Sequence, residues 1–343
     1  METAASTLAN PASDDLARLE RDGFVVLDAI LPKSEVEQAR QELAALFDRD
    51  VEARQAQGIN EAYFKESPIG QTIRTPQSHL ALDMFGKSPV FDRLLDQMLT
   101  HPRVRRVVAG WCGPHFKIGS VNIRYMTGAI DPPPAHELHR DGAYAMNLCI
   151  MLSDVEPGDN AATAIVPGTQ WSSLDPRWDT LFEAPFRLRN NPSRSGLSLF
   201  LRWNIFNNIY KARMFKKITG AFGKQGDVYF FANGETWHGR LPNMNGRRTM
   251  ICLMGCAATK PEFLNSRIAV PDATLAKLPP ALAKHLVGPF EINDTAGTMV
   301  DRIYKTRPSA PFFSLERWCK IERHCAEWIS SLVVRWALLI RGH

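Results

Sequence analysis

The hydrophobic positions in the first third of the chain repeat with the period of a helix. A short apolar strand is predicted at 23–27, and a helix begins at about 32–35. The apolar positions of that helix follow helical spacing: Val36, Ala39, Leu43, Leu46 and Phe47. A second helix is predicted over 90–108, and the alternation over 111–125 predicts a strand after it. Helices are therefore expected to dominate this part of the chain.

From about residue 120 the pattern changes to short apolar segments separated by Gly, Pro, Asn and Asp. These segments are rich in Val, Ile, Phe and Tyr, and they cover 120–126, 144–152, 163–166, 197–203, 227–232 and 248–255. Because the crossover helices of βαβ units are missing between them, the pattern favours an antiparallel sandwich or barrel. We expect a mainly β protein with flanking helices (α+β) and a cupin-like jelly-roll core.

The chain is expected to form one main domain with additions at both ends. We predict a flexible N-terminus over 1–13, a domain with N-terminal helices over 14–258, and a C-terminal extension over 259–343. The extension is expected to end in a helix at about 314–340 that packs on the same domain. Its apolar run over 328–340 is interrupted by Arg335 and falls well short of the roughly 20 residues that span a bilayer. Peripheral membrane contact by this helix stays open as an alternative.

Composition and charge narrow the class of protein. With 343 residues, 45% of them hydrophobic and 22% charged, the chain can bury a large core and is expected to be globular. A formal net charge of +5 is mild for this length and no nucleic-acid motif accompanies it, so we expect no nucleic-acid partner. The six cysteines form no CxxC pair and no signal peptide is recognisable, which favours a cytoplasmic protein.

Two short motifs supply the residue types of a metal site. His139 and Asp141 are two residues apart, so in a strand their side chains would point to the same spot. His238 follows a predicted strand almost a hundred residues later and could complete the set from a neighbouring strand. Two histidines and one carboxylate on one face of an ion select non-haem Fe(II) and leave positions open for oxygen and a co-substrate. Arg247 and Arg248 follow and could clamp a carboxylate.

These ligand types alone leave two other functions open. A single histidine is more often a surface or hydrogen-bonded core residue than a ligand, and zinc also binds His and Asp. A jelly-roll zinc hydrolase, or a jelly roll that binds a ligand without turning it over, would carry the same residues.

The order and spacing of several motifs resemble the phytanoyl-CoA dioxygenase family. The resemblance covers roughly residues 14–257. It rests on Leu19–Val26, His139–Gly142, Leu152–Pro157, Ile165–Thr169, and Gly226–Asp227 leading to Trp237–Gly239 and Pro242–Asn243. It implies a double-stranded β-helix that holds Fe(II) through His139, Asp141 and His238. It further implies 2-oxoglutarate as co-substrate, O2 as oxidant, and release of succinate and CO2.

The resemblance also assigns roles to other residues. The far carboxylate of 2-oxoglutarate is expected to bind Arg247, with Arg248 as the alternative because a one-residue shift turns the side chain to the other face. Asp141 stands where the family's halogenases carry Ala or Gly, which favours hydroxylation or a related oxidation of an unactivated C–H bond. Arg240 replaces a small Ser that is frequent in the family, and its cation could reach toward the substrate.

The remaining candidates surround the proposed iron. Asn122 and Thr169 are expected to contact the co-substrate. The expected substrate pocket comprises Arg124, His136, Tyr144, Trp237, Arg240 and Arg202. We further expect Asn122 and Arg124 to face alternate sides of their strand, so that at most one of them lines the cavity.

A basic segment at about 184–226 could indicate the chemical class of the substrate. It holds nine Lys and Arg residues and no acidic one, interleaved with aromatic and aliphatic side chains. Such a segment could form a lid for a small anionic, lipid-like, or carrier- or CoA-linked substrate. The alternative is an ordinary solvated basic face.

Overall fold

The computed structural model describes residues 11–128, 138–141, 144–157, 162–172, 214, 216–241, 243, 246–258, 270–286 and 297–306. Its helices are α1 (Pro11–Asp22), α2 (Lys33–Gln57), α3 (Pro89–Thr100), α4 (Pro102–Cys112), the 3-10 turn η2 (Thr169–Trp171), α8 (Asp272–Leu275), α9 (Pro280–Leu286) and α10 (Met299–Thr306). Its strands are β1 (Phe24–Leu27), β2 (Tyr63–Ser67), β3 (Gly70–Arg74), β4 (Ser78–Ala81), β5 (Lys117–Met126), β6 (Ala145–Met151), β7 (Thr163–Ile165), β8 (Thr219–Gly220), β9 (Val228–Phe231), β10 (His238–Arg240) and β11 (Thr249–Ala257).

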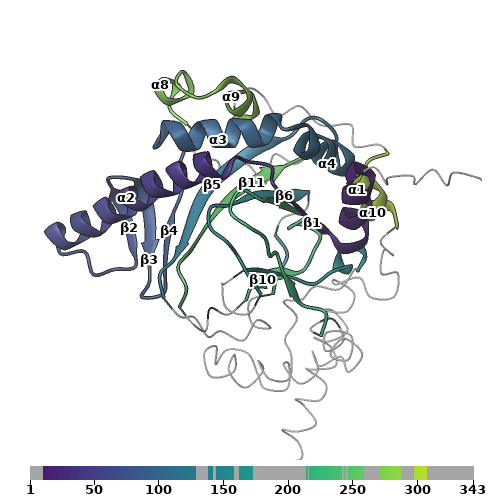
Figure 1. Ribbon diagram of the computed structural model, residues 1–343, viewed down its shortest axis with the longest axis horizontal. Coiled ribbons are helices and arrows are strands. Elements are labelled where there is room, and N and C mark those ends of the chain that lie inside the picture. The colour runs from purple at the N-terminus through teal and green to yellow at the C-terminus, as the bar shows by residue number, and fades with distance from the viewer. Residues whose placement is uncertain are drawn as a thin grey trace, which may run out of the picture.

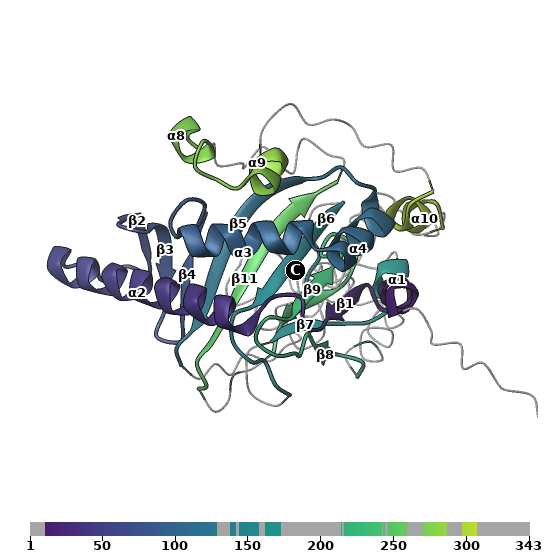
Figure 2. The ribbon, with the colours of Figure 1, turned by 45° about the horizontal axis from the view of Figure 1, so that its top comes forward.

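The strands form two antiparallel sheets that face each other. The larger sheet has the order β1-β9-β6-β11-β5-β4-β3-β2, and the smaller one has the order β10-β7-β8. Strands distant in sequence are neighbours in both sheets, as in a jelly roll. Helices α2 and α3 lie across the outer face of the larger sheet, with α9 beside α3, while β10 lies on the other side (Figure 1; Figure 2). The predicted fold class is therefore confirmed.

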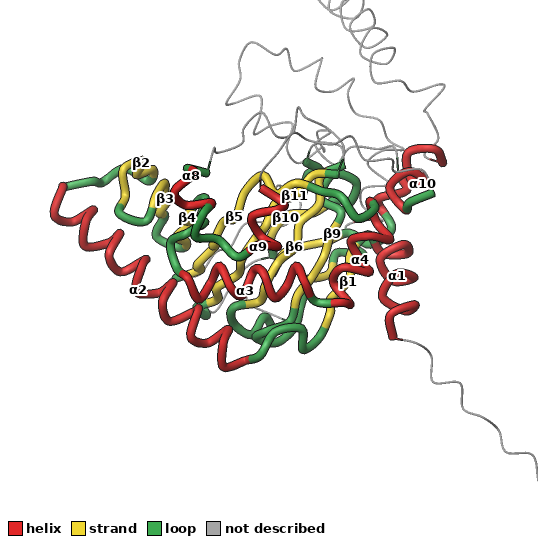
Figure 3. Tube along the Cα trace, turned by 90° about the horizontal axis from the view of Figure 1, so that it is seen from above, coloured by secondary structure: helices red, strands yellow, loops and turns green. Residues whose placement is uncertain are grey.

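Strand β9 explains why the central strands read as continuous apolar runs. Val228 and Phe230 face the helices and join the main core, whereas Tyr229 and Phe231 face the smaller sheet and join a second core. All four side chains are buried. This strand of the larger sheet is thus covered on both faces, by helices on one side and by the smaller sheet on the other. Seen from above, α2 and α3 lie in front of strands of the larger sheet (Figure 3). A strand buried on both faces loses the polar alternation of an exposed strand.

Most predicted elements are present, with shifted boundaries. The predicted segments 120–126, 144–152, 163–166, 227–232 and 248–255 correspond to β5, β6, β7, β9 and β11. Helix α2 buries the predicted stripe from Val36 to Phe47 and ends at Gly58, whose φ of 66° suits glycine. The segments 197–203 and 314–340 and most of the basic segment lie outside the described residues. Helix α1 begins at Pro11, inside the stretch predicted to be flexible.

The single helix predicted over 90–108 was wrong. Helix α3 ends at Thr100 and α4 begins at Pro102, with His101 between them in extended conformation (ψ 127°). A residue before proline is forced out of the helical region, and proline is favoured in the first turn of the next helix. Helix α4 then continues to Cys112, so Trp111 and Cys112 are helical and the strand predicted from 111 begins only at Lys117.

Strands β2, β3 and β4, which the pattern did not reveal, extend the larger sheet beyond β5. They are held to α2 by a buried polar cluster around Asp50. The Asp50 carboxylate accepts from Arg54 Nε at 2.8 Å, lies 2.7 Å from His79 Nε2, and accepts from Thr72 Oγ1 at 2.9 Å. At this position α2 is held to the strands by buried, hydrogen-bonded charged groups rather than by an apolar stripe.

None of the described helices is both long and apolar enough to cross a membrane.

Candidate metal centre and its pocket

His139 and His238 are cross-strand partners at one end of the jelly roll. The N–H of His139 donates to the carbonyl of His238 at 2.8 Å, and the N–H of His238 donates to that of His139 at 3.0 Å. This reciprocal pair sets the two imidazoles side by side, with ring centroids 4.3 Å apart. His238 begins β10, which pairs with β7. The two sequence-distant motifs are therefore joined directly by backbone hydrogen bonds.

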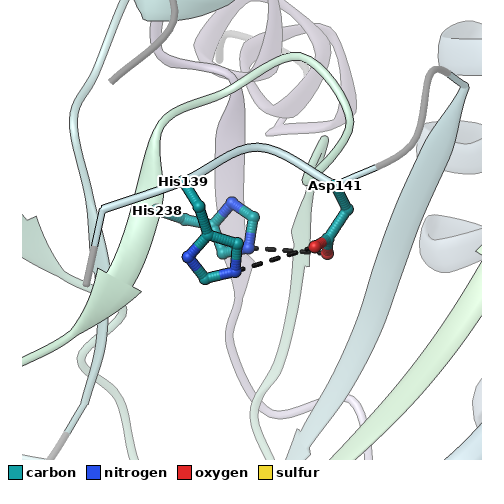
Figure 4. Close-up of side chains that lie close together, drawn as sticks. All are labelled: His139, Asp141 and His238. Atoms are coloured by element: carbon teal, nitrogen blue, oxygen red, sulfur yellow. Dashed lines mark ion pairs between the residues drawn. The ribbon is translucent and has the colours of Figure 1, made fainter. Parts of the chain in front are cut away.

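Asp141 reaches the same point from irregular backbone. Its N–H donates to the carbonyl of Asn233 at 3.0 Å, and the Asn233 amide donates to its carboxylate at 2.5 Å. The carboxylate oxygens lie 3.6 Å from Nε2 of His139 and 3.6 Å from Nε2 of His238 (Figure 4). Ligand atoms from all three side chains lie within 4.8 Å of one another, so the three side chains could hold one metal ion.

Hydrogen bonding orients the imidazole of His238 for such an ion. Its Nδ1 lies 3.0 Å from the carbonyl of Thr236, which can only accept, so Nδ1 carries the proton. Nε2 then presents its lone pair toward Asp141 and His139. A metal-bound histidine usually has its other nitrogen engaged in this way. The edge of the Phe231 ring contacts the same imidazole, with centroids 5.1 Å apart.

The charge of Asp141 is stabilised by its neighbours. Burial raises the pKa of this carboxyl, but its interactions with His238, Asn233 and His139 outweigh burial, so the pKa lies below its ordinary value. A carboxylate that is ionised at neutral pH is the form that binds a cation. The donor set therefore fits Fe(II), with two neutral nitrogens and one anionic oxygen.

The three side chains border a pocket of about 270 Å³ between the two sheets. Its described lining also includes two guanidinium groups and several side chains from the inner faces of both sheets: Arg124, Asn147, Thr163, Phe231, Gly239, Arg240 and Leu253. Arg124 and Arg240 were predicted to line the pocket. Asn147, Thr163, Phe231 and Leu253 were missed. They lie on strands, with their side chains facing inward. Strand register is needed to tell which of the alternating positions of a strand face inward.

Arg124 lies on the inner face of β5, opposite Ile251 of β11. Asn122 lies opposite Leu253 and faces the same side, because side chains two residues apart in a strand share a face. The expectation that Asn122 and Arg124 face alternate sides was therefore wrong. Of the two, only Arg124 is among the described pocket-lining residues, while the Asn122 amide oxygen accepts from the N–H of Asp83 at 3.3 Å.

The buried hydroxyl groups of Tyr229 and Thr163 lie in the same part of the molecule as Arg124. Tyr229 OH and Thr163 Oγ1 are 2.8 Å apart, and Thr163 lines the pocket. Burial raises the pKa of Cys149 to about 12 and that of Tyr229 well above its ordinary value, and the positive charge of Arg124 lowers both pKa values in part. The pocket lining thus combines the cation of Arg124 with the hydroxyl of Thr163.

Arg247 and Arg248 lie elsewhere, in exposed chain just before β11. The Arg247 guanidinium is 60% exposed and pairs with Glu156 at 3.1 Å. Neither arginine is among the described pocket-lining residues. The Asn243 amide donates to the carbonyl of Arg247 at 3.0 Å, and β11 begins two residues later, at Thr249. The expected arginine clamp on the strand after the distal histidine is therefore not at the pocket.

The other predicted residues are distributed around the site. Thr169 is fully buried, and its hydroxyl accepts from the N–H of Trp237 at 2.9 Å, so it supports the chain entering β10 rather than lining the pocket. Trp237 packs with Leu138 and Val166 in a small core. Tyr144 contacts Glu235 and Tyr304. His136 and Arg202 lie outside the described residues.

A family model described as phytanoyl-CoA dioxygenase (PhyH) matches residues 19–250. The chain belongs to the phytanoyl-CoA dioxygenase family. The match spans both metal-ligand motifs, and the resemblance drawn from the motifs is thereby confirmed. The family match ends inside β11, so helices α8, α9 and α10 lie beyond it. Comparison with curated protein sequences gave no match.

Several solved structures resemble this member of the phytanoyl-CoA dioxygenase family. HygX from Streptomyces hygroscopicus, solved with nickel, 2-oxoglutarate and hygromycin B bound, is 16% identical, with 72% of this chain and 87% of that chain covered and a TM-score of 0.46. The epimerase SnoN, in complex with Fe3+, α-ketoglutarate and nogalamycin RO, is 19% identical over 76% and 91%, with a TM-score of 0.44. The carbocyclase SnoK from nogalamycin biosynthesis is 17% identical over 78% and 91%, with a TM-score of 0.44.

Proposed function

We propose that this protein is an Fe(II)- and 2-oxoglutarate-dependent dioxygenase that oxidises an unactivated C–H bond of a small molecule, most simply by hydroxylation. The observation that carries the proposal is the convergence of His139, Asp141 and His238 at a pocket that also contains an arginine. Membership of the phytanoyl-CoA dioxygenase family supports it independently. The reaction releases succinate and CO2.

The proposed division of labour follows from the contacts. His139, Asp141 and His238 hold the iron, which, with 2-oxoglutarate bound, supplies the oxidising chemistry from O2. Asn233 and Thr236 fix the orientation of Asp141 and His238 through their hydrogen bonds. Phe231 and Leu253 line the pocket with apolar surface and exclude water from it.

We assign the far carboxylate of 2-oxoglutarate to Arg124 in place of Arg247. Arg124 lines the pocket with the hydroxyl of Thr163, whereas Arg247 is exposed and pairs with Glu156. A guanidinium and a hydroxyl together match the two oxygens of a carboxylate. The side chain would thus enter from β5 rather than from β11, one strand away.

The second guanidinium of the pocket suggests the class of substrate. Arg240 lies two residues after His238 and faces the pocket. Because the far carboxylate of 2-oxoglutarate is assigned to Arg124, Arg240 is not needed for that contact. We propose that Arg240 contacts an anionic group of the substrate, such as a carboxylate or the phosphate of a carrier- or CoA-linked acyl chain. The described cysteines are buried and none of them forms a disulfide, in keeping with a cytoplasmic enzyme.

Anaerobic titration of metal-free protein with Fe(II) and 2-oxoglutarate tests the proposal. Chelation of iron by 2-oxoglutarate is expected to produce a weak visible charge-transfer band, which His238→Ala abolishes. Decarboxylation of 2-oxoglutarate in air, measured as succinate, is expected to require the same residues. Folded protein that binds iron without the band and without succinate formation would instead favour a zinc hydrolase or a ligand-binding jelly roll.

A further inference from the structure

One short turn, residues 233–236, supports the proposed metal ligands from behind. The carbonyl of Asn233 accepts from the N–H of Asp141 at 3.0 Å, and its amide donates to the Asp141 carboxylate. The carbonyl of Thr236 accepts from Nδ1 of His238 at 3.0 Å. Because Asp141 and His238 both depend on this turn, a shift of the turn would displace two of the three ligands together.

Glu235 anchors the turn through a fully buried carboxylate. Its Oε1 accepts from the N–H of Tyr144 at 2.9 Å and from the hydroxyl of Tyr304 at 2.6 Å. The neighbouring Gly234 donates its N–H to the carbonyl of Ala145 at 3.0 Å, which ties the turn to the start of β6. A buried carboxylate is costly unless donors surround it, so each of these donors restrains where Glu235 can lie.

Tyr304 comes from α10, beyond the part of the chain that matches the family. Helix α10 is docked firmly, since Met299, Val300 and Ile303 are buried in the main core. It lies beside α1, at the same end of the molecule as α4 (Figure 1; Figure 2). A helix fixed by its apolar face can therefore hold its tyrosine hydroxyl at a constant position.

Tyr144 connects the same contacts to the backbone near Asp141. Its ring stacks on Tyr304, with centroids 4.5 Å apart and an angle of 29° between the planes. Its φ of 63° is in the left-handed region, which a non-glycine residue adopts only where its surroundings hold it. Three contacts hold this conformation: the hydrogen bond from its N–H to Glu235, the hydrogen bond that its carbonyl accepts from the N–H of Ala258, and the stacking on Tyr304.

We propose that Tyr304 is a positioning residue for the metal centre, acting through Glu235 and the turn at 233–236. The inference rests on the proposed function, because it concerns the ligands of the same iron. It gives part of the C-terminal extension a role in the active site: α10 presets Asp141 and His238 in the arrangement that binds the metal. The hydroxyl performs this role, whereas the ring packs the helix.

Tyr304→Phe separates the two contributions, because it removes the hydroxyl and keeps the stacked ring. The matched control is Tyr63→Phe, which removes an exposed hydroxyl that donates to Gln71 at 2.7 Å, far along the chain on β2. Affinity for Co(II) and for Fe(II) is measured anaerobically by equilibrium titration, alongside thermal unfolding of the metal-free proteins. We expect Tyr304→Phe to weaken metal binding roughly tenfold, the lower end of the range for partners of metal ligands. Tyr63→Phe should leave binding unchanged.

A double-mutant cycle with Glu235→Gln tests the route of the effect. A neutral amide depends less on the tyrosine hydroxyl than a carboxylate does, so Tyr304→Phe should weaken metal binding less than threefold in the Glu235→Gln background. Unchanged affinity in Tyr304→Phe, or fully additive effects in the cycle, would overturn the inference. Absence of metal binding by the unaltered protein would overturn the proposed function and this inference with it, so the two failures are distinguishable.

Discussion

Replacing Arg124 by methionine should weaken 2-oxoglutarate binding far more than the same change at Arg247. Arg124 lines the pocket, in which hydrogen bonds to a carboxylate are poorly screened by water. A hydrogen bond to a charged group contributes about 1.5–3 kcal/mol, so the loss of two gives about 3–6 kcal/mol. At 1.4 kcal/mol for each factor of ten, the lower half of that range corresponds to an affinity loss of roughly 100- to 1,000-fold.

Arg247 provides the matched control. Its guanidinium is 60% exposed, and it precedes pocket-lining Leu253 by six residues, or about 20 Å of extended chain. Arg247→Met should therefore change the KM for 2-oxoglutarate less than twofold. Both variants keep an unbranched side chain, so their folding can be compared directly by thermal unfolding.

The assay is succinate formation without substrate at saturating Fe(II), with the KM for 2-oxoglutarate as the readout and anaerobic calorimetry as an independent measure of affinity. The assignment of the far carboxylate to Arg124 predicts that Arg124→Met raises the KM for 2-oxoglutarate and leaves the metal affinity nearly unchanged. A large rise for Arg247→Met or Arg248→Met, together with a silent Arg124→Met, would refute the assignment and restore the strand after the distal histidine as the source of the clamp.

Two further changes have defined outcomes. His139→Ala or His238→Ala should abolish succinate formation and Fe(II) binding with the fold intact; circular dichroism checks the fold, and retained turnover would contradict the ligand assignment. Burial raises the pKa of Asp92 to about 6. Between the ordinary pKa of an aspartate and about pH 6, the folded state therefore binds more protons than the unfolded state. The free energy of unfolding thus falls as the pH rises from about 4 to 6. Asp92→Asn should thus stabilise the protein by about 1–2 kcal/mol at pH 8 and hardly at pH 4 in urea unfolding; an equal gain at both pH values would contradict this.

Local sequence was sufficient for the elements whose pattern is strong. Helix α2 and the buried strand β9 follow directly from apolar spacing, because each buries a regular stripe or a continuous run. Strands β2 to β4 were not predicted, because their exposed, polar residues carry little alternation and they are held by the buried Asp50 cluster. The break at Pro102 was readable from the sequence and was missed because apolar spacing continues across it.

Three features could be read from local sequence: the jelly-roll class, the family, and the residue types of the proposed metal ligands at positions 139, 141 and 238. Ligand identity is local, so a short motif preserves it. The tertiary structure was needed to show that Arg247 and Arg248 are not among the described pocket-lining residues, and that Glu235 joins the turn at 233–236 to Tyr304. Strand register and the docking of α10 bring together residues far apart in the chain, and a difference of one residue in register exchanges the inner face for the outer one.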